Sequence, residues 1–143
     1  MLTQLIYSSR TTRTLTSVDL ISITSTSQQN NLLAGITGAL CYDRGSFLQL
    51  IEGEHSVIAH LYPLLLQDER HSELKILDLK EITERRFANW SMGFFNHENE
   101  ISQLFLKHTK MAEFAPFSIS ALDANKFFDE VKKHVTLPKQ KSE

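Results

Sequence analysis

One strand-like run, residues 46–52 with the sequence SFLQLIE, is apolar on both of its alternating faces yet carries a glutamine, Gln49, at its centre. Successive side chains of a strand point to opposite faces of a sheet, so a run of this kind requires cover on both sides. A buried amide that finds no hydrogen-bond partner costs about 1–3 kcal/mol. The fold must therefore supply two covering layers, and either the chain or a bound molecule must supply a partner for Gln49.

The same run forms the second half of a predicted β-hairpin. Residues 35–42 are its first strand, and Asp43-Arg44-Gly45 is the connecting loop, with glycine where a positive φ is expected. The other predicted elements, in chain order, are a strand at 2–7, a polar loop at 8–16, a helix at 18–31, a helix at 54–68, strands at 74–82 and 91–95, helices near 101–108 and at 123–134, and a frayed tail at 137–143.

This order, β-α-β-β-α-β-β, predicts an α+β fold of the ferredoxin-like kind: a five-stranded mixed sheet with two helices on one face, plus C-terminal helices. The two main helices cover one face of the central strand. The C-terminal helices or a second subunit must cover the other face, and for this reason we expect a homo-oligomer.

Two local signals bear on the main helices. Thr16 is the expected N-cap of the first helix, with Asp19 three residues on, but the β-branched and hydroxyl-rich run that follows needs support from tertiary contacts or a ligand. Pro63 lies inside the second helix, where a proline should kink or shorten it at a cost of about 3 kcal/mol.

Composition excludes several classes of protein. The 143 residues, 41% hydrophobic and 22% charged, fit one soluble globular domain, and the net charge of −2 implies no broad basic surface for nucleic acid. The single cysteine, Cys41, cannot form an internal disulfide and suits a reducing compartment. No apolar run approaches the length of a membrane span, and the N-terminus does not resemble a signal peptide. We therefore expect a cytoplasmic protein with no membrane or nucleic-acid partner.

The polar pair Tyr7 and Gln49 is the first candidate site. Gln49 shares its side of the strand with Phe47 and Ile51, and Tyr7 shares its side of the first strand with Leu5. A tyrosine hydroxyl and an amide on neighbouring strands can form a hydrogen bond, and the other end of the amide can reach a third group. Two interpretations stay open: an internal pair that only satisfies itself, or a pair that faces a ligand.

Two further pairs have both ordinary and functional interpretations. Asn30-Asn31 ends the first predicted helix, where asparagine is a common cap, but an asparagine side chain also pairs well with an imide edge. Trp90 and Met92 share one side of the predicted last strand, where core packing is the ordinary interpretation.

Motifs for catalysis are absent from the sequence. Arg70 and His71 close the second helix, where a basic pair suits the helix dipole or meets a phosphate. We find no Walker loop, no G-x-G-x-x-G, no nucleophile elbow and no histidine spacing typical of a metal site. We therefore expect neither an enzyme nor a metal protein.

Taken together, these residues resemble the BLUF family of blue-light sensors that use FAD. The matching blocks, in order, are LIYSS, the pair Asn30-Asn31, GITGALCY, FLQLIEG, DERH and NWSMG. The resemblance runs from about Leu2 to about Gly93, and the C-terminal part, with FAPFSISALDANKFFDEV, looks like the short members with two capping helices and no output domain. It implies a flavin cofactor, FAD with FMN as an alternative, held by a domain at 1–96 and followed by capping helices and a tail at 97–143.

The resemblance also implies a role for each site residue. Tyr7 would donate an electron and a proton, Gln49 would rearrange its hydrogen bonds between Tyr7 and the flavin, and Trp90 and Met92 would compete for the place beside Gln49. The implied flavin-binding residues are Ile23 and Leu65 at the ring faces, Asn31 at the imide edge, Ser27, Asn30, Phe47 and Gln49 along the pocket, and Asp68, Arg70 and His71 toward the ribityl and phosphate end. The signal would pass to the C-terminal helices and on to an unidentified downstream protein or an oligomer interface.

Three alternatives to a BLUF sensor stay open. The first is a light-indifferent interaction module with the same fold. The second is a small ferredoxin-like hydrolase in which Arg70 and Asn30 bind an anion. The third is a photoreceptor of the cysteine-adduct type, which requires Cys41 to face the flavin.

Overall fold

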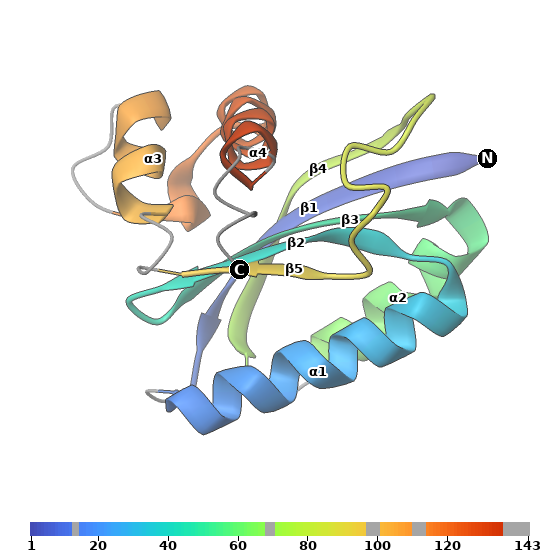
Figure 1. The fold of residues 1–143 in the computed structure, drawn as a ribbon, viewed down its shortest axis with the longest axis horizontal. Coiled ribbons are helices and arrows are strands. Elements are labelled where there is room, and N and C mark those ends of the chain that lie inside the picture. The colour runs from blue at the N-terminus through green and yellow to red at the C-terminus, as the bar shows by residue number, and fades with distance from the viewer. Residues whose placement is uncertain (13–14, 68–70, 97–100, 110–113, 136–143) are drawn as a thin grey trace.

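A five-stranded mixed sheet separates two layers of helices in the computed structural model (Figure 1). The structure describes residues 1–12, 15–67, 71–96, 101–109 and 114–135. The strands are β1 (Leu2–Thr11), β2 (Thr37–Asp43), β3 (Ser46–Glu54), β4 (His71–Glu81) and β5 (Gly93–Phe95), in the spatial order β4-β1-β3-β2-β5. β5 pairs with β2 in parallel, and the other pairings are antiparallel. The predicted ferredoxin-like class is confirmed.

The helices divide between the two faces of the sheet. α1 (Ser17–Ala34) and α2 (His55–Gln67) lie on one face, and α3 (Ile101–Thr109) and α4 (Ala121–Val135) lie on the other, together with a short 3₁₀ turn, η2 (Pro116–Ser118) (Figure 1). The C-terminal helices of the same chain thus provide the second cover that the central strand requires. The apolar face from which we expected a homo-oligomer is covered without a second subunit, and the oligomer stays a prediction.

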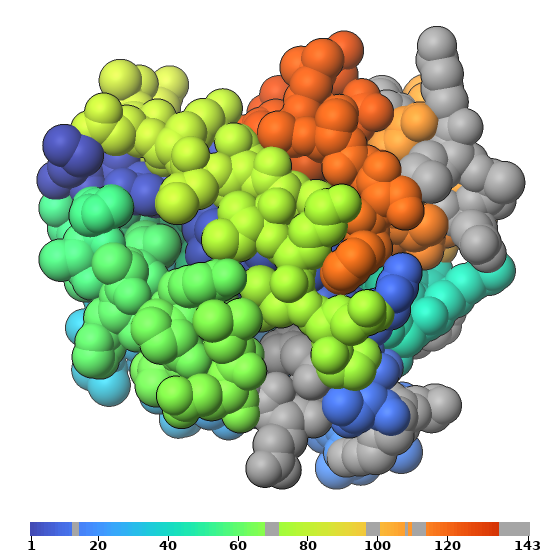
Figure 2. Space-filling view, turned by 180° about the vertical axis from the view of Figure 1, so that it is seen from behind, coloured from blue at the N-terminus to red at the C-terminus, as the bar shows by residue number. Residues whose placement is uncertain are grey.

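The central strand β3 contributes to both layers in alternation. Phe47 and Ile51 join the apolar cluster beneath α1 and α2. Leu48 and Leu50 join the cluster beneath α3 and α4, where the rings of Phe105, Phe127 and Phe128 pack edge to face. β4 closes one edge of the sheet, and Figure 2 shows it between α4 and α2.

The ends of α1 follow from local chemistry. The Thr16 hydroxyl accepts from the backbone N–H of Asp19, and the Asp19 carboxylate accepts from that of Thr16, so the predicted cap is a full capping box. The helix ends at Gly35, whose φ of 72° lies in the left-handed region that glycine adopts without strain. α2 runs through Pro63 to Gln67, so the proline does not end the helix.

Several predicted boundaries are wrong. α1 ends at Ala34 and not at 31, and β4 begins at His71 and not at 74. β1 continues to Thr11 through residues placed in a polar loop, because Ser8 and Ser9 pair with β3 on one side and β4 on the other. Sheet pairing on both edges outweighs their polar composition. β5 begins only at Gly93, so Trp90 and Met92 precede the last strand and do not share a strand face.

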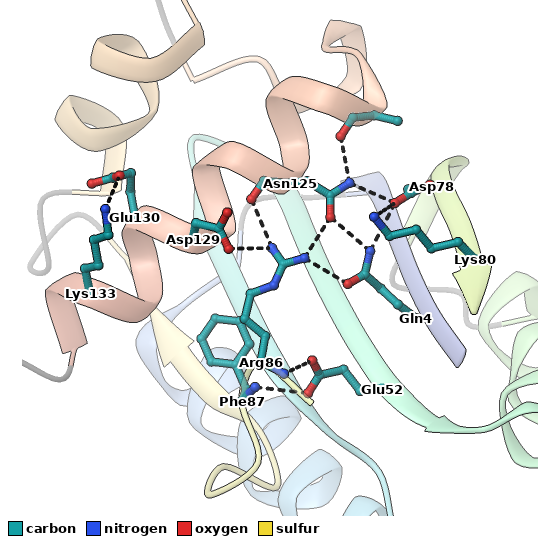
Figure 3. A network of polar contacts seen from close by, with 11 residues as sticks. Gln4, Glu52, Asp78, Lys80, Arg86, Phe87, Asn125, Asp129, Glu130 and Lys133 are labelled. Carbon is teal, nitrogen blue, oxygen red and sulfur yellow. Dashed lines mark hydrogen bonds and ion pairs between the residues drawn. The ribbon is translucent and has the colours of Figure 1, made fainter. Parts of the chain in front are cut away.

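A buried carboxylate on β3 holds the segment that follows β4. Glu52 is 0% exposed, and its oxygens accept from the backbone N–H groups of Arg86 and Phe87 (Figure 3) and from the hydroxyl of Thr37. A buried carboxylate is costly unless it is hydrogen-bonded, so these bonds tie residues 86–87 firmly to β3.

The side chain of Arg86 joins that segment to α4. Its guanidinium donates to the Asn125 carbonyl at 3.0 Å, to Asn125 Oδ1 at 2.8 Å and to Gln4 Oε1 at 3.0 Å, and it lies 3.4 Å from the carboxylate of Asp129 (Figure 3). The Asn125 amide in turn donates to Asp78 on β4 at 2.8 Å. One polar network therefore connects α4 to β1, to β4 and to the segment before β5.

Candidate functional site

A cavity of about 230 Å³ lies between α1, α2 and the three central strands. Its apolar wall includes Ile23 on α1, Leu65 on α2 and Phe47 on β3. Its polar wall is formed by Tyr7, Thr26, Ser27, Asn30, Asn31 and Gln49. Apolar surfaces with a few polar side chains gathered on one side are typical of a small-molecule site.

Tyr7 and Gln49 form a directly opposed pair across β1 and β3. The Tyr7 hydroxyl donates to Gln49 Oε1, and the two residues are 2% and 8% exposed. Gln49 Nε2 donates to Met92 Sδ at 3.3 Å. The amide is therefore held at both ends by the protein, and because its nitrogen carries two N–H groups, it can also donate into the cavity it lines.

The asparagines of α1 do not cap the helix. The helix continues past Asn31 to Ala34, and Gly35 supplies the cap. Asn30 and Asn31 instead line the cavity, and Asn31 Nδ2 donates to the Ser91 carbonyl at 3.0 Å.

Met92, rather than Trp90, occupies the place beside Gln49. Met92 is 1% exposed, whereas Trp90 is 36% exposed and packs its ring 6.2 Å from that of Phe95. The chain at 90–92 is held from α1 as well, since Gln28 Nε2 donates to the Met92 carbonyl at 3.0 Å. Gln28 was not predicted as part of the site, because an amide on an exposed helix face carries no sequence signal of its own.

Several lining residues were missed by the sequence prediction but follow its spacing. Thr26 lies three residues after Ile23 on the same helix face, and Leu61 shares the inner face of α2 with Leu65. Leu64, which the resemblance to the BLUF family places near the flavin, also lines the cavity. On the sheet, Leu40 faces Gln49 across β2 and β3, and Ile51 lies two residues beyond Gln49.

Two of the residues predicted at the phosphate end, Asp68 and Arg70, lie outside the described part of the chain. The prediction that His71 closes the second helix is wrong, because His71 begins β4; its side chain also lies outside the described part. Their roles stay predictions, and the hydrolase alternative, which needs Arg70, has no described anion site to support it.

Cys41 lies on the wrong face of the sheet for chemistry in the cavity. It is buried in the cluster beneath α3 and α4, opposite the face that carries Gln49. Burial raises the pKa of the Cys41 thiol well above its ordinary value, so it is not a reactive thiolate at neutral pH. This placement disfavours the cysteine-adduct alternative.

The described part of the chain lacks two other kinds of feature, a metal site and a membrane-spanning helix. Its histidines, cysteine and carboxylates form no group of three that could hold a metal ion. No described helix is both long and apolar enough to cross a membrane.

A known protein family matches the part of the chain that forms the cavity. The family described as BLUF, sensors of blue-light using FAD, matches residues 2–93. The photoactivated adenylate cyclase subunit beta of Euglena longa is 30% identical over 128 residues, which cover 82% of this chain and 15% of that protein. The chain thus spans only a small part of the length of that relative.

Solved structures of similar size share the whole arrangement. The photo-activated state of BlsA superposes with a TM-score of 0.82 at 29% identity, covering 92% of this chain and 95% of that one. The dark-state structure of BlrB, a BLUF protein, has a TM-score of 0.77 at 31% identity, covering 95% and 97% of the two chains.

Proposed function

The chain belongs to the BLUF family of FAD-binding blue-light sensors, and from this we propose that Tyr7 and Gln49 carry the photoreaction while the C-terminal helices receive its result. The observation that carries the proposal is the Tyr7–Gln49–Met92 hydrogen-bond chain, in which Tyr7 and Gln49 line the cavity. A self-contained polar pair would not need to line a cavity, whereas a light-driven relay does.

The cavity suits the flat ring of a flavin, which is apolar on its faces and polar along its imide edge. Ile23 and Leu65 stand on the two helices that flank the cavity, where they would contact the ring faces. Asn31 would pair with the imide edge, since an amide both donates and accepts. The remaining proposed contacts are Ser27, Asn30, Phe47 and Gln49 along the pocket and Asp68, Arg70 and His71 toward the phosphate end. FMN shares the ring and the ribityl phosphate, so it would make the same contacts.

A flavin held here would supply a strong oxidant under blue light, beside the buried phenol. Tyr7 would give up one electron, and its hydroxyl proton would pass to Gln49 Oε1, which already accepts that hydrogen bond. Gln49 would then rotate or change tautomer. Once Tyr7 has regained its electron and proton, the charges would be restored but the amide would present a different pattern of donors and acceptors. The proposed signalling state is this changed pattern.

The proposed output route has two starting points: Gln49 on β3 and Met92 in the segment before β5. Glu52, three residues beyond Gln49 on the same strand, holds residues 86–87 from the opposite face of the sheet. Arg86 continues the connection to Asn125 on α4 (Figure 3). A shift at Gln49 or Met92 would therefore reach α4 first along the backbone, of β3 or of residues 87–92, and then through the hydrogen bonds of Glu52 and Arg86. A downstream protein or a second subunit would respond there.

The first test is a visible absorption spectrum of the purified protein in the dark and under blue light. We expect a flavin band that shifts slightly to the red and recovers in darkness. A reversibly bleached band would instead indicate adduct or redox chemistry. A colourless protein that FAD does not reconstitute would favour the light-indifferent interaction module.

Two variants make the test specific. Gln49→Ala and Tyr7→Phe should both keep the flavin and lose the red shift, because each removes one partner of the donor–acceptor pair. Tyr42→Phe is the control: its ring packs 4.7 Å from that of Phe47, and no described residue hydrogen-bonds its hydroxyl. A normal photocycle in Gln49→Ala would contradict the proposal.

A further inference from the structure

Three consecutive carbonyls in the segment before β5 are each held by one hydrogen bond. The Trp90 carbonyl accepts from the backbone N–H of Gly38, and the Ser91 carbonyl accepts from Asn31 Nδ2, each at 3.0 Å. The Met92 carbonyl accepts from Gln28 Nε2, also at 3.0 Å. Strand pairing begins only at Gly93. At residues 91 and 92, side-chain amides of α1 donate to the carbonyls in place of the backbone N–H groups of a neighbouring strand.

We propose that Gln28 is a positioning residue for the photoreaction: it fixes the Met92 backbone so that Met92 Sδ stays beside Gln49 Nε2. The inference rests on the proposed function, since it assigns Gln28 to the same hydrogen-bond chain. Gln28 does not line the cavity and acts only through Met92.

The hydrogen bond between Gln49 Nε2 and Met92 Sδ is too weak to fix the position of the sulfur by itself. A thioether is a weak acceptor, and a methionine side chain has three rotatable bonds, so it adapts readily to other positions. Met92 is 1% exposed, so packing confines its side chain, and within that packing the place of the sulfur follows the position of the backbone. The bond from Gln28 holds the Met92 carbonyl directly, and removing one such bond changes an equilibrium about fivefold.

Gln28 is also the anchor that can be changed without touching the cofactor site. Asn31 lines the cavity, so a variant there would alter both the anchor and the pocket. Gln29 offers a matched control, because it is the same residue type at the next position of α1, is exposed, and has no described hydrogen bond from its side chain.

The experiment is methyl NMR of the flavin-loaded protein labelled at its methionine methyl groups. The chain has three methionines, so the Met92 signal is assigned with Met92→Leu. The variants are Gln28→Ala and Gln28→Glu, the second of which keeps the shape but cannot donate when ionised. In the dark, we expect both to increase the population of an alternative Met92 conformer about fivefold. Gln29→Ala and Gln29→Glu should leave the signal unchanged.

Recovery kinetics provide the second readout. A loosened segment lowers the barrier to exchange of groups beside Gln49, so the red-shifted band of the Gln28 variants should recover about three- to fivefold faster, with its size retained. Met92 signals and recovery rates equal to those of the Gln29 variants would overturn the inference. Loss of the light response in the unmodified protein would refute the proposed function instead, and the dark NMR comparison would still decide whether Gln28 positions Met92.

Discussion

At the scale of single residues, the two ends of the Gln49 amide have unequal partners. Its oxygen accepts from the hydroxyl of Tyr7, and its nitrogen donates to the sulfur of Met92, which is a weaker acceptor than oxygen. An amide bonded in this way loses little when its nitrogen exchanges the thioether for a better acceptor. The arrangement keeps Gln49 satisfied while leaving it easy to reorient, which suits a switch better than a purely structural pair.

Cys41 gives a prediction on chemistry and on pH. Cys41→Ala should keep the full red shift, because the thiol lies on the opposite face of the sheet from the cavity. Loss of the shift in this variant would favour the cysteine-adduct mechanism. Absorption spectra before and after illumination decide the matter.

The same thiol should make the free energy of unfolding fall as the pH rises into the alkaline range. Burial raises the pKa of Cys41 in the folded protein, whereas the unfolded thiol titrates near its ordinary pKa of roughly 8.5. Above that pH the unfolded state loses a proton that the folded state keeps, so unfolding becomes more favourable. Relative to Cys41→Ala, the protein should lose about 1.4 kcal/mol of unfolding free energy per pH unit. Urea unfolding from pH 7 to 10 measures this difference, and parallel curves for the two proteins would contradict it.

At the scale of helices and strands, local sequence patterns predicted the elements that carry a regular alternation or a cap. They missed the elements that form only through contacts with distant parts of the chain. The hairpin at residues 35–52, the capped α1 and the Tyr7–Gln49 pair follow from period-two alternation, turn residues and helix caps. The extension of β1 to Thr11 does not, because its polar residues become strand only through pairing on both edges. The residues assigned to a cofactor came from a resemblance to known sensors and not from periodicity.

The polar network on the other face was beyond prediction for a similar reason. Gln4, Glu52, Arg86 and Asn125 come from four separate parts of the chain, and each alone has the ordinary interpretation of a solvated surface residue. Only the fold brings them together. The same holds for Gln28, whose partner at Met92 is 64 residues away.

Asn125 tests whether α4 receives the signal. Asn125→Ala removes the side-chain bonds to Arg86, Gln4 and Asp78 and keeps the bond from Arg86 to the backbone carbonyl of residue 125, so we expect the unfolding free energy to fall by about 1–3 kcal/mol. The red shift should persist, whereas any light-dependent change in hydrogen exchange of the α4 amides should shrink at least severalfold. Lys126→Ala, at the neighbouring exposed position of α4, is the control. An unchanged light response of α4 in Asn125→Ala would contradict a route through the Asn125 side chain.

At the scale of the whole molecule, the two faces of one sheet each contribute to a separate apolar cluster. The cluster with α1 and α2 forms the cavity, and the cluster with α3 and α4 covers the back of the same strands. The proposed boundary between 1–96 and 97–143 therefore divides the chain by sequence, while the packing joins both parts.

A truncation tests how separable the two parts are. Ending the chain at residue 96 would expose Ile6, Leu48 and Leu50, each losing roughly 1.5–3 kcal/mol of burial. We expect the shortened protein to aggregate or to bind flavin only weakly, as measured by light scattering and by flavin content after purification. A soluble, monomeric and fully loaded 1–96 fragment would show instead that the helices are an accessory to an independent domain.

The alternation of β3 also limits which changes of length the chain tolerates. Phe47, Gln49 and Ile51 face the cavity, whereas Leu48 and Leu50 face the α3–α4 layer. Inserting or deleting one residue between Gly45 and Gln49 would exchange the two sets, so that the amide would enter a pocket of phenylalanines and a leucine would take its place opposite Tyr7. Substitutions in this strand change the chemistry of one position at a time, but a shift of one residue would remove the sensor and the core together.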